Sequence, residues 1–552
     1  MTRRIPHSSF FVLHVRDWLF VTVSTLLMSL PAGYEPHHFA KTLFAGAFVQ
    51  SMAYSILLAY LTRKSVLARN IVLVMLALLF GTETFTFLMF GSRFDPGILT
   101  LVLQTSRKEI GEFFQVYVLH PLPLLAIVGG VGAVILLLRF VNRFNASSHS
   151  SPLTSHPSPL TSHLSIPIML LGFALPFIPT HIPLGKNTVN ELAASLSFVI
   201  GKHKEIESME KMLGKIRILC EPSAEEAPVV VLVIGESFNK HHSSLYGYPL
   251  PTSPRLQKER DCGRLIVFNH ATTPTNGTSF AMRHIFSLKG CNTDENDMRQ
   301  YVLMPAVFKK AHYAVAYFDN QYTRSSGGSL DYSCGYFLNP EVINDYCFDF
   351  RNETTAPFDA DFINQYAPEF RKQPKSLNII HLMGQHFDAR LRYPDTFDIF
   401  SQEHVNRPDL SAEERQKVAE YDNATCYNDY TLSRILDCFH TTDAVVVYLS
   451  DHGEQVYDGP GHYFGRQFGD EFDRETLENV FEVPLMVWCS DLFKTRRPHV
   501  FEALGHLSDK GFCIDDLSYL LFHLAGISSN FDSPRHDMLH PSYQPHQSVI
   551  HE

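Results

Sequence analysis

The stretch Val229-Val-Val-Leu-Val-Ile-Gly-Glu-Ser237 is an unbroken apolar run that ends in a glycine, a carboxylate and a hydroxyl. Such a run predicts a strand buried on both faces, as in parallel sheets. A second run, Ala444-Val-Val-Val-Tyr-Leu-Ser450, is followed directly by Asp451 and His452. Ligands of open α/β sheets bind beyond the carboxyl ends of the strands, so we expect both strand ends to lie at one edge and share a site.

The apolar pattern continues through the rest of this half of the chain. Further buried parallel strands are predicted at Leu265–Phe268, Ala314–Phe318, Asn378–Leu382 and Val483–Val487. Helices are predicted between them, for example over about 412–437. Alternating strands and helices predict a doubly wound α/β sheet with helices on both faces. We expect this domain to occupy residues 226–545.

The two strand ends carry groups that can bind a metal. Glu236 and Asp451 offer carboxylate oxygens and His452 offers an imidazole nitrogen, a mixed set that suits zinc or manganese. The alternative is that these are ordinary loop residues that cap helices. Two such strand ends in one α/β domain favour the metal site.

Net charge, apolar runs and cysteine spacing exclude some classes of protein and of site. The 552-residue chain has 46 Lys and Arg against 57 Asp and Glu, a net charge of −11. This acidic balance argues against a partner that is a nucleic acid. Long apolar runs dominate the first 190 residues, whereas all nine cysteines lie at or beyond Cys220 and none form a C-x-x-C pair. A cysteine zinc site is therefore not expected.

The apolar runs predict an α-helical membrane domain over residues 1–190, with about five transmembrane helices. They lie at Trp18–Tyr34, Ala40–Leu61, Ile71–Phe90, Val118–Leu138 and Ile166–Ile182. Lys and Arg residues before the first, between the second and third, and after the fourth place these ends in the cytoplasm. The domain after the fifth helix then lies outside, and the first helix serves as an uncleaved anchor.

Three connecting segments follow from this topology. Residues 91–117 form an external loop, residues 145–165 a low-complexity cytoplasmic loop with a repeated SPLTSH unit, and residues 191–225 a linker or bridging helix. In an oxidising compartment the cysteines can pair, so we expect two to four disulfides, with Cys334–Cys347 a local candidate. The alternative is that most are buried as small apolar residues.

Two features of the membrane half could be functional. Glu83 falls inside the third apolar run, where an acid is costly; it is either a functional residue or lies near the outer interface. Thr105 and Glu109 share one face if the external loop is helical, and could meet an ammonium head group. The alternative for this pair is an exposed amphipathic helix.

Several motifs together resemble one family. The matching stretches are VIGESFNKHHSSLYGY at 233–248, ATTPTNGTSFAMRHIFS at 271–287, IIHLMGQHFDARLRYP at 379–394, YDNATCYNDYTLSRIL at 421–436 and LSDHGEQVY at 449–457. They resemble the bacterial phosphoethanolamine transferases of the alkaline phosphatase/sulfatase superfamily, which modify lipid A and the lipopolysaccharide core. The resemblance covers nearly the whole chain and implies a sulfatase-like α/β catalytic domain.

The resemblance implies a nucleophile and a metal site. Thr278 is similar to the family's nucleophilic threonine, with Thr275 and Ser279 as rivals. Thr278 also resembles a ligand of one catalytic zinc ion, together with Glu236, Asp451 and His452. Mn²⁺ is the alternative metal, and a second zinc ion is left open.

The resemblance also implies substrate-binding residues. His386 and His462 are similar to the family's active-site histidines, and Thr105 and Glu109 resemble its donor-site pair. The family's basic residue near Asp319 is not cleanly matched, and Arg324 is the expected substitute. Arg283 and His284 replace a Pro-Cys pair that follows the nucleophile in the better-known lipid A enzymes.

The implied reaction moves phosphoethanolamine from phosphatidylethanolamine to lipid A or a lipopolysaccharide or glycan acceptor, through a metal-activated phosphothreonine. The implied location is the bacterial inner membrane, multi-pass, with the catalytic domain in the periplasm. A glycerol-phosphate transferase and a phosphatase- or sulfatase-type hydrolase of the same superfamily are the alternatives. The sulfatase signature Cys/Ser-x-Pro-x-Arg does not occur. A membrane-anchored sensor without activity is disfavoured, because every expected metal ligand is present.

Overall fold

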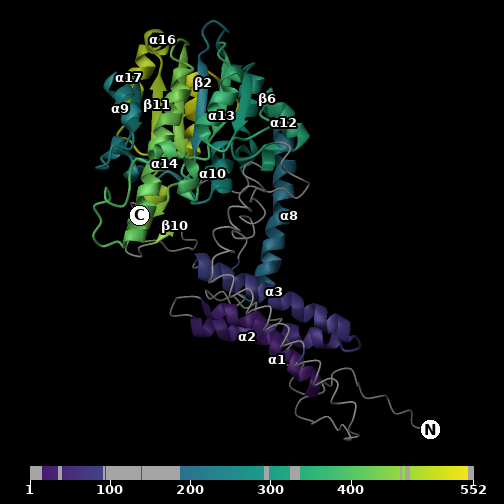
Figure 1. Ribbon diagram of the computed structural model, residues 1–552. Helices are drawn as coiled ribbons and strands as arrows, with labels where there is room; N and C mark the ends of the chain where they lie inside the picture. The colour runs from purple at the N-terminus through teal and green to yellow at the C-terminus, as the bar shows by residue number, and fades with distance from the viewer. Residues whose placement is uncertain are drawn as a thin grey trace, which may run out of the picture. The chain divides into compact units, whose positions relative to one another are not determined.

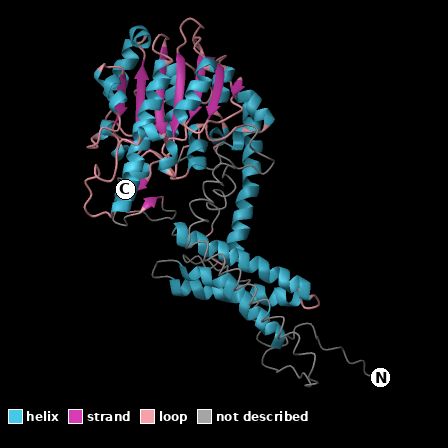
Figure 2. Ribbon diagram, viewed as in Figure 1, coloured by secondary structure: helices cyan, strands magenta, loops and turns pink. Residues whose placement is uncertain are grey.

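The computed structural model describes residues 15–34, 40–90, 94, 139, 187–290, 297–323, 336–459, 463–466 and 473–544. The chain divides into two compact units, Met1–Lys202 and His203–Glu552. Helices make up the described part of the first unit, and a sheet flanked by helices makes up the second (Figures 1 and 2).

The first unit begins with three apolar helices. They are α1 (Val15–Ser29), α2 (Ala40–Leu61) and α3 (Val66–Phe90). The predicted first span is helical throughout, but it changes at Leu30 into the 3-10 turn η2 (Leu30–Tyr34). Pro31 explains this change, because proline has no N–H group to continue the α-helical hydrogen bonds.

Two of the described helices are long and apolar enough to cross a membrane, over Phe44–Leu61 and Val66–Leu88. α1 packs on α2 through Phe20, Val21, Ile56 and Ala59, and Leu73 of α3 joins this cluster. The predicted spans at 118–138 and 166–182 and the repeat at 151–163 lie outside the described residues. The expected number of five membrane helices is therefore not tested.

A seven-stranded sheet organises the second unit. Its order is β3 (Leu265–Phe268), β11 (Leu485–Cys489), β8 (Ala444–Ser450), β2 (Val229–Gly235), β7 (Ser376–His381), β5 (Ala314–Asp319) and β6 (Phe350–Arg351). All six predicted strands are present. Short pairs lie apart from this sheet: β1 (Ile218–Cys220) with β13 (Ser528–Ser529), β9 (Gln455–Val456) with β10 (Phe464–Gly465), and β4 (Ala271–Thr272) with β12 (Phe512–Cys513).

One strand runs against the expectation of a fully parallel sheet. β2 is parallel to both β7 and β8, but β11 is antiparallel to β8 and β3, so the parallel prediction for this segment was wrong. Leu485 pairs with Leu449, so β11 starts beside the end of β8. The connection between them stays at that edge of the sheet, and a strand that starts there must run back.

Helices cover both faces of the sheet. Val229, Val231 and Val233 face a core that α9 (Pro254–Asp261), α13 (Asp359–Tyr366) and α14 (Ala412–Asp437) close (Figure 1). Against the alternate residues, α11 (Met304–Lys310) packs on β5 and α18 (Leu517–Ala525) on β2. The other described helices are α8 (Thr188–Leu213), α10 (Thr278–Ile285), α12 (Glu341–Cys347), α15 (Arg474–Phe481), α16 (Asp491–Arg496) and α17 (Pro498–His506).

The cysteines are less paired than expected. Six are free thiols: Cys220, Cys262, Cys347, Cys426, Cys438 and Cys489. The pair Cys334–Cys347 is therefore wrong, and three remaining cysteines allow at most one bridge instead of two to four. Cys347 ends α12, where its thiol is buried against α11. It acts as a small apolar residue, which was the alternative interpretation.

Candidate active site

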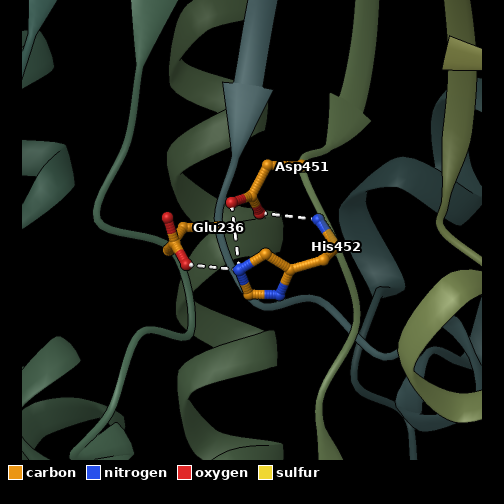
Figure 3. Close-up of side chains that lie close together, drawn as sticks. All are labelled: Glu236, Asp451 and His452. Atoms are coloured by element: carbon orange, nitrogen blue, oxygen red, sulfur yellow. Dashed lines mark hydrogen bonds and ion pairs between the residues drawn. The ribbon is translucent and has the colours of Figure 1, made fainter. Parts of the chain in front are cut away.

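The site begins at the ends of two neighbouring strands. β2 and β8 are parallel and adjacent, and Gly235 pairs with Ser450 in their ladder. The next residues along each strand, Glu236 and Asp451, therefore leave the sheet side by side, with His452 directly after. Figure 3 shows the three side chains converging below the two strand ends. The expectation that both strand ends form one cluster is met.

The cluster is compact and closed to solvent. Ligand atoms of Glu236, Asp451 and His452 all lie within 4.8 Å of one another, and all three residues are buried. His452 Nε2 lies 3.2 Å from Glu236 Oε1 and 3.1 Å from Asp451 Oδ2. His452 Nδ1 lies 2.7 Å from the carbonyl oxygen of Gly453, and this contact leaves Nε2 facing the carboxylates.

Thr278 joins the cluster from another part of the chain. It is the first residue of α10, and its Oγ1 lies 3.1 Å from Glu236 Oε2 and 3.2 Å from His452 Nε2. Gly277 is the N-cap of this helix, so a capping role for the Thr278 hydroxyl is excluded. Of the two rivals, Thr275 accepts a hydrogen bond from the N–H of Gly277, and Ser279 is buried.

These four residues fit a zinc ion. Around a tetrahedral zinc with bonds of about 2.0 Å, neighbouring ligand atoms lie about 3.3 Å apart. Four pairs of ligand atoms lie close to this value: Thr278 Oγ1 is 3.1 Å from Glu236 and 3.2 Å from His452, and His452 is 3.2 Å from Glu236 and 3.1 Å from Asp451. Asp451 Oδ2 is also buried, and no well-formed hydrogen bond reaches it from any residue that the structure describes, although His452 Nε2 lies 3.1 Å away. A buried carboxylate oxygen with a poorly aligned donor is costly, and a cation at this point would satisfy it.

Charge at the cluster favours a cation as well. Burial raises the pKa of Glu236, but the hydrogen bond and charge of His452 outweigh it and hold this pKa well below its ordinary value. Burial and the nearby Arg466 lower the pKa of His452. Asp451 and Glu236 raise this pKa by more, so that it reaches about 9. The carboxylates therefore stabilise positive charge here, whether a proton or a metal cation carries it.

Neighbouring strands hold the carboxylates in place. Gln321, just beyond β5, donates from Nε2 to Glu236 Oε2 at 3.1 Å, and Ser237 donates to Glu236 Oε1 at 2.9 Å. Gly384 has a φ of +49°, and a Cβ atom there would lie 2.7 Å from the carbonyl oxygen of Glu236. The sequence alone assigns Gln321 no role, although the rule of strand carboxyl ends would have included it.

The other expected site residues are placed only in part. His386 follows β7, is half-buried, and its Nδ1 lies 2.9 Å from the carbonyl oxygen of Phe387. β7 is parallel to β2 and pairs with it, so His386 follows a strand that ends at the same edge of the sheet as Glu236. Thr105, Glu109, His462 and Arg324 lie outside the described residues, and their roles stay predictions.

The structure also shows where two further charged residues lie, Glu83, which the sequence singled out, and Arg466, which it did not. Glu83 lies on α3 and is 1% exposed, so its side chain is buried. Arg466 was missed from the sequence, although its Nη1 lies 2.6 Å from His452 Nε2. It belongs to a short hairpin after the Asp-His pair, and no regular spacing marks it in the sequence.

The fold and the cluster agree with comparisons to known proteins. The family model described as Sulfatase matches residues 228–527, more than half of the chain, and this range contains every residue of the cluster. The chain belongs to the sulfatase family. The α/β catalytic fold implied by the sequence is thereby shown.

Curated relatives extend beyond the sulfatase-family domain. Phosphoethanolamine transferase EptC of Escherichia coli strain K12 is 25% identical over 482 residues, which cover 83% of this chain and 80% of that protein. Phosphoethanolamine transferase EptA of Helicobacter pylori is 30% identical over 278 residues, which cover 48% of this chain and 49% of that protein. The resemblance to phosphoethanolamine transferases is confirmed.

Solved structures show the same architecture. The C-terminal periplasmic domain of EcEptC from Escherichia coli superposes with a TM-score of 0.50 and 26% identity, covering 59% of this chain and 89% of that one. The integral membrane protein EptA from Neisseria meningitidis covers 95% of this chain and 97% of its own, with a TM-score of 0.65 and 17% identity. The second likeness extends over nearly the whole chain.

Proposed function

We propose that this protein is a membrane-anchored phosphoethanolamine transferase that works through a phosphothreonine at Thr278. One observation carries the proposal: the Thr278 hydroxyl lies 3.1–3.2 Å from Glu236 and His452, within a ligand set that fits zinc. A hydroxyl placed there is a nucleophile, whereas a hydroxyl that only caps a helix would turn back to its own backbone.

Glu236, Asp451, His452 and Thr278 would hold one zinc ion, with Mn²⁺ as the alternative. A divalent cation bound there would promote ionisation of the threonine hydroxyl and offset charge on the phosphoryl group. A second metal ion stays an open prediction, because the described residues hold no second such ligand group.

The chain's own residues then account for group transfer. Thr278 Oγ1 forms a bond to phosphorus of phosphatidylethanolamine, and the bond from phosphorus to the diacylglycerol oxygen breaks. The hydroxyl proton of Thr278 is balanced by the proton that the leaving oxygen gains. The acceptor oxygen later attacks the same phosphorus, and the bond to Thr278 breaks. His386 follows β7, the strand beside β2, and we assign it the transfer of protons or contact with phosphate oxygens. The N–H groups that begin α10 can also face the phosphate.

The membrane helices suit a lipid donor. Leu67, Ile71, Met75 and Leu78 on α3 are all more than half exposed and recur every three or four residues. Such an exposed apolar stripe is stable against lipid chains. We therefore propose a multi-pass protein of the bacterial inner membrane with its catalytic domain in the periplasm, where Thr105 and Glu109 would meet the donor.

The name of one relative indicates which acceptor receives the phosphoethanolamine group. One similar protein, 26% identical over 282 residues, is the Kdo(2)-lipid A phosphoethanolamine 7''-transferase of Escherichia coli strain K12. The proposed acceptor is accordingly lipid A or a lipopolysaccharide-core or other glycan group.

Labelled phosphatidylethanolamine tests the function and the nucleophile together. The zinc-loaded full-length enzyme should transfer the labelled head group to lipid A or core acceptors. Thr278→Ala should lower turnover by at least about 10³-fold, the order seen when a nucleophile is removed, while the folded protein still binds zinc through its three remaining ligands, more weakly than the parent. Labelled Thr278 should be found by peptide mapping when acceptor is withheld.

The matched variants are Thr275→Ala and Ser279→Ala, which should keep most of the activity. If one of them abolishes transfer and Thr278→Ala does not, the nucleophile is that neighbour. Release of free phosphoethanolamine in the presence of acceptor would instead identify a hydrolase.

A further inference from the structure

Arg466 lies on a hairpin that reaches the candidate active site, and the proposed reaction gives this residue no role so far. β9 and β10 pair antiparallel, with Gly465 opposite Gln455. Gln455 lies three residues after His452, so the hairpin returns the chain to the metal cluster. Arg466 is the residue directly after β10, and only 13% of its side chain is exposed.

The guanidinium group is anchored on both sides of the nucleophile. Its Nη1 lies 2.8 Å from the carbonyl oxygen of Asn276, two residues before Thr278, and 2.6 Å from His452 Nε2. Its Nε lies 3.5 Å from Glu454 Oε2. Thr278 Oγ1 lies 3.2 Å from the same His452 nitrogen. The guanidinium and the nucleophilic oxygen are therefore close neighbours around one atom.

Metal binding would free part of this group. His452 Nε2 has one lone pair, and if this nitrogen held a metal cation, the pair would no longer be open to Arg466 Nη1. Nη1 then keeps only the Asn276 carbonyl, and Nη2 donates to no residue that the structure describes. The result is a buried, permanently charged fork with free N–H groups beside the nucleophile.

We propose that Arg466 is a catalytic residue that binds two oxygens of the transferring phosphoryl group. A planar guanidinium matches a phosphate through two parallel hydrogen bonds, and it keeps its charge at any working pH. It neither gains nor loses a proton while the Thr278 oxygen bonds to phosphorus and the bond to the leaving oxygen breaks. Its contribution is to stabilise the charge that builds on the phosphoryl oxygens.

This assignment rests on the proposed phosphoryl transfer. Arg466 supplies a positive group from another loop. Glu454 and the Asn276 carbonyl orient it, since both lie on elements that also carry His452 or Thr278.

The test compares Arg466→Ala with Arg474→Ala. Arg474 is an exposed arginine on α15, and among the described residues its side chain pairs with Glu478 alone. In the zinc-loaded full-length enzyme, Arg466→Ala should lower kcat/KM for labelled phosphatidylethanolamine by about 10²- to 10³-fold, the usual loss for one donor to a transition-state oxygen. Zinc content should stay unchanged, and Arg474→Ala should match the parent. Guanidinium added at millimolar concentration should restore part of the activity of Arg466→Ala. It should not raise the activity of the parent or of Arg474→Ala. Arg466→Lys should recover little, because a lysine offers no fork.

Orthovanadate gives a readout that does not depend on the donor lipid. It should raise the melting temperature of the zinc-loaded parent and of Arg474→Ala, and raise that of Arg466→Ala much less. Equal stabilisation of Arg466→Ala and the parent would overturn the proposal. So would a loss of activity that comes with lost zinc and does not respond to guanidinium. If the parent fails to use phosphatidylethanolamine but the vanadate difference remains, the proposed function is wrong and Arg466 still binds phosphoryl oxygens.

Discussion

At the scale of single residues, the site concentrates negative charge at the point where we propose that a cation binds. Glu236 and Asp451 bring two buried carboxylates to within hydrogen-bonding distance of one imidazole nitrogen. Like charges this close and this buried repel each other, so the arrangement is stable only with positive charge between them. The Thr278 hydroxyl shares that position, which couples the strength of the nucleophile to occupancy of the site.

Asp451→Asn tests this coupling. The amide keeps the shape of the side chain but removes one negative charge and one strong oxygen ligand. We expect zinc content to fall to background and transfer to be lost with it. Zinc should also stop raising the melting temperature, since a ligand stabilises only the state that binds it. Metal analysis and thermal melting with and without zinc measure both effects.

Asp491→Asn is the matched control. Asp491 begins α16 after β11, at the opposite edge of the sheet, and 73% of its side chain is exposed. It should leave zinc binding and transfer unchanged. Retention of full activity by Asp451→Asn after thorough chelation would contradict the metal site.

At the scale of elements, the sequence was most informative where strands are buried on both faces. VVVLVIG and AVVVYLS have no polar residue before the strand end, so their type, extent and shared edge could be predicted. The direction of β11 could not, because a short apolar run looks the same in either direction. Gln321 and Arg466 were not assigned roles for a related reason: both reach the cluster from loops, where position depends on tertiary packing and follows no period.

The buried imidazole of His242, in the loop after β2, contacts carboxylates on α14 and in the loop after β8. His242 Nδ1 lies 2.7 Å from Asp422 Oδ1 on α14, and Nε2 lies 3.2 Å from Asp458 Oδ2. Tyr248 donates to the other oxygen of Asp422 at 2.8 Å, and Arg407 faces Asp458 at 3.4 Å. Burial lowers the pKa of His242, but the two carboxylates raise it more, to about 10. The group is therefore a charged imidazolium at neutral pH.

His242→Gln should be destabilising, by about 3–5 kcal/mol, because it removes one partner from a buried ionic network. The stabilisation has a defined pH dependence. The folded-state pKa lies above the unfolded value of about 6.5, so the contribution is complete below pH 6.5 and is lost as pH rises towards 10. The difference in free energy of unfolding between the parent and His242→Gln should shrink over this range.

Denaturant unfolding followed by Trp488 fluorescence measures that difference. His312→Gln is the control, because 77% of the His312 side chain is exposed and its contact is with a surface glutamate. It should change the free energy of unfolding little at any pH. A difference between the parent and His242→Gln that grows with pH would show that His242 is neutral in the folded state.

At the scale of the whole molecule, the chemistry and the membrane attachment lie in separate units. His203–Glu552 contains the complete seven-stranded sheet and all four residues of the proposed zinc site. Its beginning and end are joined, because β1 pairs with β13. Met1–Lys202 contains the two described helices that are long and apolar enough to cross a bilayer.

The fragment 203–552 should therefore fold alone and bind zinc. The similar periplasmic domain of EcEptC was crystallised by itself, and it covers 59% of this chain. Zinc should raise the melting temperature of the fragment as it does that of the full-length protein, because every ligand is present.

Transfer from phosphatidylethanolamine in vesicles should nevertheless fall by about 10²-fold or more. In the proposed membrane protein the site is tethered to the bilayer that contains the donor, whereas the fragment must meet the donor from solution, without the positional advantage of being anchored. Thr278→Ala in the fragment sets the background. A fragment that unfolds or ignores zinc would show that the two units depend on each other, and transfer at the full-length rate would show that anchoring contributes nothing to the reaction.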